Sequence, residues 1–173
     1  MKIKPPLLSV LIIFLYCTQA SAQTEDSTLQ EKPSRLKLSG PRVGISLITG
    51  TDADKLKKDL DAGPVISQFG WQVETQFLST KEGIAGLSEW LFLVGGVEQA
   101  TFLPSLSWLV GLRTAGGTEF GVGPNLSVSG SALVLAAGVT EQTWSLNFPI
   151  NLAVVIAKGG PRFALLVGFN SRE

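Results

Sequence analysis

Apolar and polar residues alternate through much of the second half of this 173-residue chain. Between Glu119 and Ser129 the even positions carry Phe, Val, Pro, Leu and Val, and the odd positions carry Glu, Gly, Asn and Ser. The same alternation returns between Trp144 and Val154. Because a period of two places the two sets on opposite faces of a strand, both segments are predicted to be β-strands.

The polar face of these strands is small and almost uncharged. Residues such as Gly, Ser and Asn fit the crowded interior of a barrel better than a face turned to water. Charge is also scarce from Ile84 to Ala157, although this stretch has no apolar run long enough for a spanning helix. The pattern therefore favours strands whose apolar face meets something other than water.

Eight such strands are predicted, and most of the turns between them are short and rich in glycine. A short helix, capped by Thr51 or Asp52, is predicted in the first connection, either as a solvated loop helix or as a plug or partner docking site. The strand ranges are 42–48, 65–78, 84–97, 102–113, 119–129, 131–140, 144–157 and 162–170. The predicted fold class is all-β: an antiparallel up-and-down β-barrel of about eight strands, with one short helix in the first long loop.

Three prolines fall inside the predicted strands, namely Pro104, Pro124 and Pro149. Each removes a backbone donor from the ladder, and a closed barrel has no free edge on which to place it. Bulges or broken pairing are therefore expected at these positions.

The N-terminus has the features of a secretory signal peptide. Lys2 and Lys4 precede an apolar stretch from Leu7 to Tyr16, and Ala20–Ser21–Ala22 forms an A-x-A cleavage site. The apolar stretch is only about ten residues long, whereas a spanning helix needs roughly twenty. Three parts are predicted: a signal peptide over residues 1–22, a flexible polar leader over 23–40 and a β-barrel domain over 41–173.

Composition excludes much familiar chemistry. The sequence has no His, and its only Cys, Tyr and Met lie within the predicted signal peptide. The remaining chain therefore lacks a disulfide, a thiol nucleophile, a Cys/His zinc site and a His general base. No catalytic, cofactor-binding or metal-binding residue is predicted, and we expect the protein not to be an enzyme. Removing Lys2 and Lys4 leaves twelve basic against fourteen acidic groups, which does not indicate nucleic-acid binding.

Five charged residues share the polar face of the predicted strands: Arg42, Glu74, Arg113, Glu119 and Arg162. In an up-and-down layout, Arg42, Arg113 and Glu119 lie toward the rim that holds the N-terminus. The five form a candidate charge network in the lumen. This network either closes or tunes a narrow interior, or only supports the barrel, because unpaired interior charge is costly.

Four tryptophans, Trp71, Trp90, Trp108 and Trp144, lie in four different predicted strands. Tryptophan forms aromatic girdles at the two surfaces of a membrane, where the ring is apolar and the N–H reaches the headgroups. The alternative is packing in the core of a soluble sandwich. We take the four as a candidate aromatic girdle.

This pattern resembles the small eight-stranded outer-membrane β-barrels of bacteria, the OmpA/OmpX-like group. The resemblance rests on the A-S-A cleavage site, eight alternating strands, small polar interior residues and short turns, over about Arg42 to Asn170. It is closest to uncharacterised bacterial secreted barrel proteins, which imply no activity. The outer-membrane barrel enzymes generally depend on a His that this chain lacks. The segments that carry the likeness are 40–44, 68–71, 103–108 and 119–125.

Two functional hypotheses follow. The first is a non-enzymatic small outer-membrane β-barrel of a diderm bacterium, exported through its signal peptide, with outer-membrane lipid as its partner and a structural or envelope-interaction role. The second is a secreted or periplasmic soluble β-barrel that binds a small apolar ligand, with its apolar face turned inward. The second would be favoured if six residues pointed to the barrel axis: Phe120, Val122, Leu126, Leu146, Phe148 and Ile150.

Overall fold

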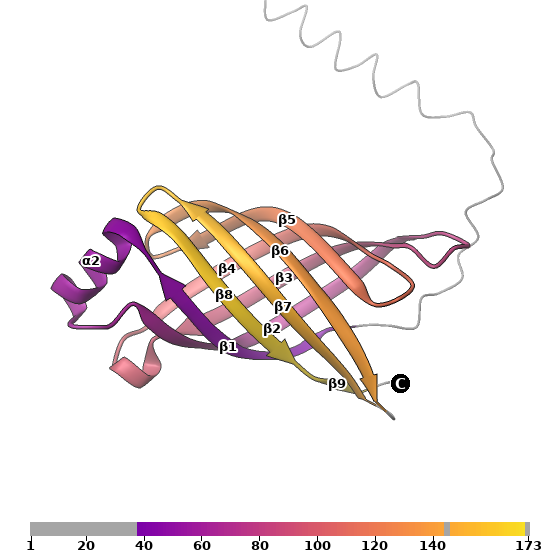
Figure 1. Ribbon diagram of the computed structural model, residues 1–173, viewed down its shortest axis with the longest axis horizontal. Coiled ribbons are helices and arrows are strands. Elements are labelled where there is room, and N and C mark those ends of the chain that lie inside the picture. The colour runs from indigo at the N-terminus through magenta and orange to yellow at the C-terminus, as the bar shows by residue number, and fades with distance from the viewer. Residues whose placement is uncertain (1–37, 144–145, 172–173) are drawn as a thin grey trace, which may run out of the picture.

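The computed structural model describes residues 38–143 and 146–171, which form a closed β-barrel (Figure 1). The predicted signal peptide, most of the predicted leader and Trp144 lie outside the described residues. No helix in the two described ranges is both long and apolar enough to cross a membrane.

Eight antiparallel strands form the wall in sequence order. Each strand pairs with the next, and β1 pairs with β8 to close the sheet. The short β9 (Asn170–Ser171) pairs with the start of β7. The predicted up-and-down barrel of eight strands is confirmed. The strands are β1 (Gly40–Ile48), β2 (Val65–Ser79), β3 (Ala85–Gly95), β4 (Leu103–Arg113), β5 (Thr118–Ser127), β6 (Gly130–Thr143), β7 (Leu146–Ala157) and β8 (Gly160–Gly168).

The predicted short helix is also present. It is α2 (Gly50–Leu60), whose N-cap is Thr49 rather than Thr51 or Asp52. Leu56 packs with buried apolar residues at the ends of β1 and β2, and the backbone N–H of Asp52 donates to the carbonyl oxygen of Gly159 at 3.1 Å. The helix is therefore attached both to the rim and to the β7–β8 turn.

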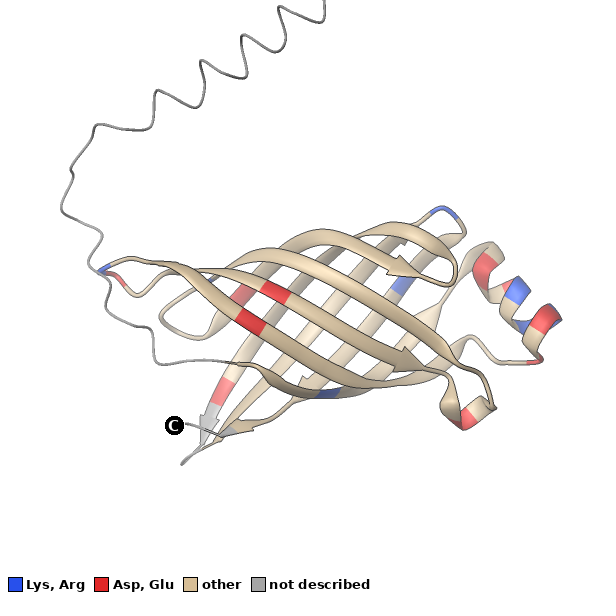
Figure 2. Cartoon of the chain, turned by 180° about the vertical axis from the view of Figure 1, so that it is seen from behind, with Lys and Arg blue, Asp and Glu red and all other residues tan. Residues whose placement is uncertain are grey.

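The strand directions give the barrel two different ends. The terminal end carries the start of β1, the β2–β3 and β4–β5 turns and the end of β8. The helical end carries α2, the 3-10 helix η1 (Val97–Gln99) and the β5–β6 and β7–β8 turns. Figure 1 shows α2 beyond one end of the barrel and the C-terminus at the other. In Figure 2 the charged residues are most concentrated on α2, and the others are spread over the turns and along the much longer strands.

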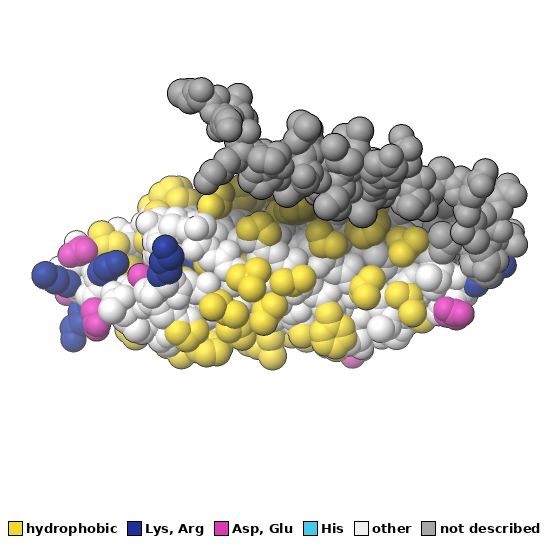
Figure 3. Space-filling view, turned by 90° about the horizontal axis from the view of Figure 1, so that it is seen from above, with side chains coloured by type: hydrophobic (Ala, Val, Ile, Leu, Met, Phe, Trp, Pro, Cys, Tyr) yellow, Lys and Arg dark blue, Asp and Glu magenta, His cyan; other side chains and the backbone are white. Residues whose placement is uncertain are grey.

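The two sets of alternating residues lie on opposite sides of the wall. Phe120, Val122 and Leu126 are exposed on the outside of β5, whereas Glu119 and Asn125 are buried inside. Leu146 and Ile150 on β7 are exposed as well. Figure 3 shows apolar side chains across the middle of the visible face and charged side chains at its two ends. The apolar set therefore covers the outer surface and the polar set faces the interior.

Each of the three strand prolines is paired on one side only. Pro104 pairs with β3, and Pro124 and Pro149 both pair with β6. On their other sides the ladders have gaps: β4 and β5 are unpaired between Ser107 and Val110, and the β7–β8 ladder begins at Ile150, after Pro149. The expected broken pairing is confirmed, because proline has no N–H to donate on that side.

Several interior glycines allow neighbouring strands to come close. A Cβ atom at Gly70 would lie 1.8 Å from the carbonyl oxygen of Phe92 on β3, and Gly44 and Gly123 make equally close approaches to backbone. At Gly121 the nearest atom to such a Cβ is a side-chain carbon at 3.5 Å. Glycine is therefore required at Gly70 by the curvature of the wall, but not at Gly121.

This difference predicts a matched pair of variants. We expect Gly70→Ala to lower the free energy of unfolding by about 1–3 kcal/mol, the usual cost of overpacking. Gly121→Ala should change it by no more than about 0.5 kcal/mol. Urea unfolding monitored by tryptophan fluorescence measures both, and equal effects of the two variants would contradict the role assigned to Gly70.

The connection after β3 is fixed to β2 by Glu98 of η1. The backbone N–H of Ser67 donates to Glu98 Oε1 at 2.8 Å, and the Ser67 hydroxyl donates to Oε2. These hydrogen bonds lower the pKa of Glu98 to about 2. Because the folded pKa lies below its ordinary value, this contact stabilises the protein above about pH 4 and is lost as the pH falls toward 2.

We therefore expect Ser67→Ala to raise the pKa of Glu98 toward its ordinary value, since one of the two hydrogen bonds is lost. An NMR titration of the Glu98 side-chain carboxyl carbon measures this pKa. Ser88→Ala, which removes another outward hydroxyl on the wall, should leave it unchanged. An unaltered pKa in Ser67→Ala would show that the hydroxyl does not stabilise the carboxylate.

Candidate functional site

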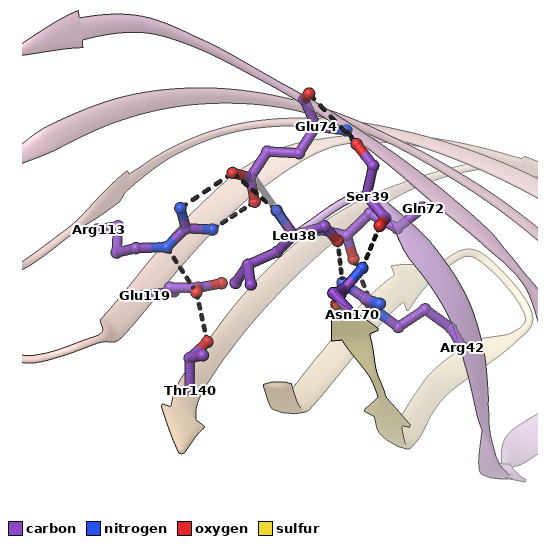
Figure 4. A network of polar contacts seen from close by, with 9 residues as sticks. All are labelled: Leu38, Ser39, Arg42, Gln72, Glu74, Arg113, Glu119, Thr140 and Asn170. Atoms are coloured by element: carbon purple, nitrogen blue, oxygen red, sulfur yellow. Dashed lines mark hydrogen bonds and ion pairs between the residues drawn. The ribbon is translucent and has the colours of Figure 1, made fainter. Parts of the chain in front are cut away.

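Three charged side chains form an ionic cluster inside the terminal end of the barrel (Figure 4). Arg113 on β4 donates from Nη1 to Glu74 Oε1 on β2 at 2.9 Å, and its Nη2 donates to the second oxygen of the same carboxylate. Its Nε donates to Glu119 Oε1 on β5 at 2.7 Å, and Thr140 on β6 donates to that same oxygen at 2.9 Å. All four residues are buried, so the guanidinium bridges two carboxylates away from bulk water.

Arg42 lies beside this cluster but bonds to neutral groups. Its Nε donates to Gln72 Oε1 at 3.0 Å, and its Nη2 donates to the carbonyl oxygen of Leu38 at 2.6 Å (Figure 4). Leu38 is fully buried, and the backbone N–H of Glu74 donates to the Ser39 hydroxyl at 2.9 Å. The last residues of the predicted leader therefore already lie within the barrel, where they fill the terminal end together with the charged residues.

The fifth predicted network residue, Arg162 on β8, lies toward the helical end. Its Nη1 donates to Ser127 Oγ and its Nη2 donates to Asn125 Oδ1, both at 3.1 Å. It makes no contact with the ionic cluster among the described hydrogen bonds and ion pairs. The structure thus brings Arg42, Glu74, Arg113 and Glu119 together and leaves Arg162 apart.

Between the ionic cluster and the helical end, the interior of the barrel contains a cavity of about 360 Å³. Its polar lining includes Gln68, Gln72, Asn125 and Arg162, and residues of α2 line its outer part. This volume falls within the range of small-molecule sites. Its apolar lining includes Leu91, Leu93, Leu109, Val134, Val155 and Leu166.

The cavity also contains a carboxylate that the sequence did not assign to the interior. Glu89 on β3 lies directly opposite Glu74 on β2, and it lines the cavity. It makes no hydrogen bond or ion pair to another described residue. The stretch Trp90–Val94 beside it is apolar at every position, so alternation could not show on which face Glu89 lies. Only the register against Glu74 places it inside.

The described tryptophans occupy one side of the wall. Trp71, Trp90 and Trp108 lie on β2, β3 and β4, and all three are exposed. Trp90 and Trp108 are the central residues of their strands, and their rings stack with centroids 5.9 Å apart. Trp108 Nε1 donates to Ser88 Oγ at 3.0 Å. These side chains are outside the barrel, as a girdle requires, but they lie midway along the wall in one patch.

Five exposed phenylalanines lie nearer the rims, whereas the exposed Phe69 and Phe92 lie midway along the wall beside the tryptophans. Phe77, Phe120 and Phe169 are at or next to strand ends on the terminal end, and Phe102 and Phe163 are near the helical end. Their closeness to the predicted turns was the signal that could have found them. Exposed aromatic side chains therefore extend from both rims to the middle of the wall.

The interior offers ionic and hydrogen-bonding groups. Within residues 38–143 and 146–171, no group of three or more His, Cys, Asp or Glu side chains could hold a metal ion. Comparison of the chain with protein-family models, curated proteins and solved structures finds no match. The function is therefore inferred from the two faces of the barrel itself.

Proposed function

We propose that this protein is a small outer-membrane β-barrel of the OmpA/OmpX-like type, with a non-enzymatic structural or envelope-interaction role. The observation that carries this proposal is the outer surface. Among the side chains that the structure describes, those facing outward on the eight strands are apolar or small and neutral, except Glu141 near the end of β6. Soluble monomers rarely expose a continuous apolar patch larger than a few hundred Å². Contact with lipid accounts for a surface that is apolar around the whole wall.

The dimensions of the barrel support the same proposal. The eight strands are 9 to 15 residues long, and a membrane-crossing β-strand needs about 9–11. The β2–β3 and β4–β5 turns at the terminal end have five and four residues, and the two longest connections, which contain α2 and η1, are at the helical end beside the two-residue β5–β6 and β7–β8 turns. Outer-membrane barrels have short periplasmic turns and longer outer loops, so we assign the terminal end to the periplasm.

The soluble alternative has less support. It requires an apolar interior and a polar exterior, but Phe120, Val122 and Leu126 point away from the axis. The interior instead holds buried charge at the terminal end and a partly polar cavity above it. Because the ionic cluster and Leu38 fill the terminal end, we do not propose open conduction through the barrel.

Cell fractionation tests this proposal. We expect the full-length chain, expressed with residues 1–22 intact in a diderm bacterium, to be recovered in the outer membrane and to resist salt and carbonate washes. A chain without residues 1–22 serves as the control and should not reach that membrane. Recovery of the full-length chain as a soluble monomer without detergent would overturn the proposal.

A further inference from the structure

The cavity is the part of the interior that the structural role leaves unexplained. Its inner end borders the ionic cluster, because Glu89 lies opposite Glu74 across β2 and β3. Its middle is lined by leucine and valine, and its outer end lies between α2 and the β5–β6 turn. A molecule can therefore enter only from the helical end, since the charged residues and Leu38 fill the other.

One carboxylate at the inner end bonds to neither of the two guanidinium groups there, although both attract it. Glu74, Glu89 and Glu119 face two guanidinium groups, Arg42 and Arg113. Arg113 bonds to Glu74 and Glu119, and Arg42 bonds to Gln72 and backbone carbonyls. Glu89 is left directly opposite a like charge, an arrangement that destabilises a cross-strand pair. A cation beside Glu89 would offset this repulsion.

The outer end of the cavity is less suited to bind the charged part of a ligand. The two terminal nitrogens of Arg162 already donate to Ser127 and Asn125, and the carboxylate of Asp52 attracts the same guanidinium. Buried Gln68 Oε1 and Arg162 Nε line the cavity without a hydrogen-bond partner among the described residues. Asp52 Oδ2 also lines the cavity without a hydrogen-bond partner in the described ranges, but Asp52 Oδ1 lies 3.9 Å from Lys55 Nζ, so this carboxylate has an ion pair. The outer end therefore adds hydrogen-bonding capacity, whereas Glu89 at the inner end has no ion pair among the described residues.

We propose that the cavity is a binding site for a small amphiphile that carries a protonated amine. The ammonium group lies against Glu89, and the apolar part lies against the leucine and valine side chains of β3, β4 and β6 to β8. This site does not depend on whether the outer face of the barrel meets lipid. The proposed site goes beyond the structural role of the barrel, because it assigns to the cavity the binding of a positively charged ligand.

The test uses n-hexylamine, n-hexanol and hexanoate as probes of one length and three charges. The folded protein in neutral detergent micelles, with labelled leucine methyl groups, is titrated with each probe by NMR. We expect n-hexylamine to shift the methyl signals of Leu91 and Leu109 and to bind at least tenfold more tightly than n-hexanol. Glu89→Gln keeps the shape of the side chain and should reduce n-hexylamine to the affinity of n-hexanol.

One control variant and three possible results distinguish this proposal from its alternatives. Glu98→Gln removes a carboxylate from the outer surface and should leave n-hexylamine binding unchanged. Equal binding of amine and alcohol to the unaltered protein would overturn the role of Glu89. Preferential binding of hexanoate that is lost in Arg162→Gln would also overturn the proposal, because it would place an anion at the outer end. Unshifted methyl signals with every probe would show that the cavity takes no such ligand.

Discussion

Replacing Arg113 with Gln should lower the free energy of unfolding by about 3–5 kcal/mol, the cost of leaving a buried charge without its partner. Arg113 is 2% exposed and bonds to both Glu74 and Glu119. Without it, Glu74 and Glu119 lose their only ion-pair partner among the described residues, beside Glu89, which bonds to no described cation. Urea unfolding of the refolded barrel, followed by tryptophan fluorescence, measures the loss.

Two further variants separate unpaired charge from simple loss of a side chain. Arg162→Gln removes a guanidinium whose hydrogen-bond partners, Ser127 and Asn125, are neutral, so it should cost only about 1 kcal/mol. Adding Glu74→Gln and Glu119→Gln to Arg113→Gln should restore much of the lost stability, because the two carboxylates that Arg113 bonded are then neutral amides. Equal losses in Arg113→Gln and Arg162→Gln would show that the ionic cluster has no special place in the stability of the barrel.

Much of this cluster could be predicted because strand geometry is regular. Arg113 and Glu119 flank one short turn on the polar set of β4 and β5, so a hairpin register brings them opposite each other. The eight strands themselves follow from the alternation and the glycine-rich turns. For Glu74, alternation predicted only that the side chain faces the interior. It could not predict the contact with Arg113, because Arg113 is two strands away.

The rest depends on information that alternation does not contain. Glu89 is on a strand that is apolar on both faces at Trp90–Val94, so only pairing with β2 places it inside. The position of the tryptophans along the wall depends on where each strand begins, and Trp90 proved central in β3. Leu38 is buried through tertiary contacts, although the sequence around it is polar. The alternation along a strand therefore predicts which face of the wall a residue lies on, whereas the pairing register between strands determines which residues contact each other.

Replacing Leu152 with Arg gives the sharpest test of what the outer face contacts. Leu152 is 63% exposed and lies near the middle of β7. In a lipid bilayer an Arg there should lower the free energy of unfolding by about 2–4 kcal/mol, because the guanidinium meets the hydrocarbon core. In water the same change on an exposed position should stay within about 0.5 kcal/mol. Urea unfolding from phospholipid vesicles measures the difference.

Val128 supplies the matched control, since it is also 63% exposed but follows the last residue of β5 at the helical end. Val128→Arg should cost no more than about 1 kcal/mol, because its guanidinium reaches the headgroups and water. Leu152→Ala separates the loss of the leucine from the introduction of charge. Exposure is equal at the two positions, so only a surrounding medium that changes with depth can make Leu152→Arg more costly than Val128→Arg. Equal costs would mean that the apolar wall meets a uniform solvent, and the membrane assignment would fail.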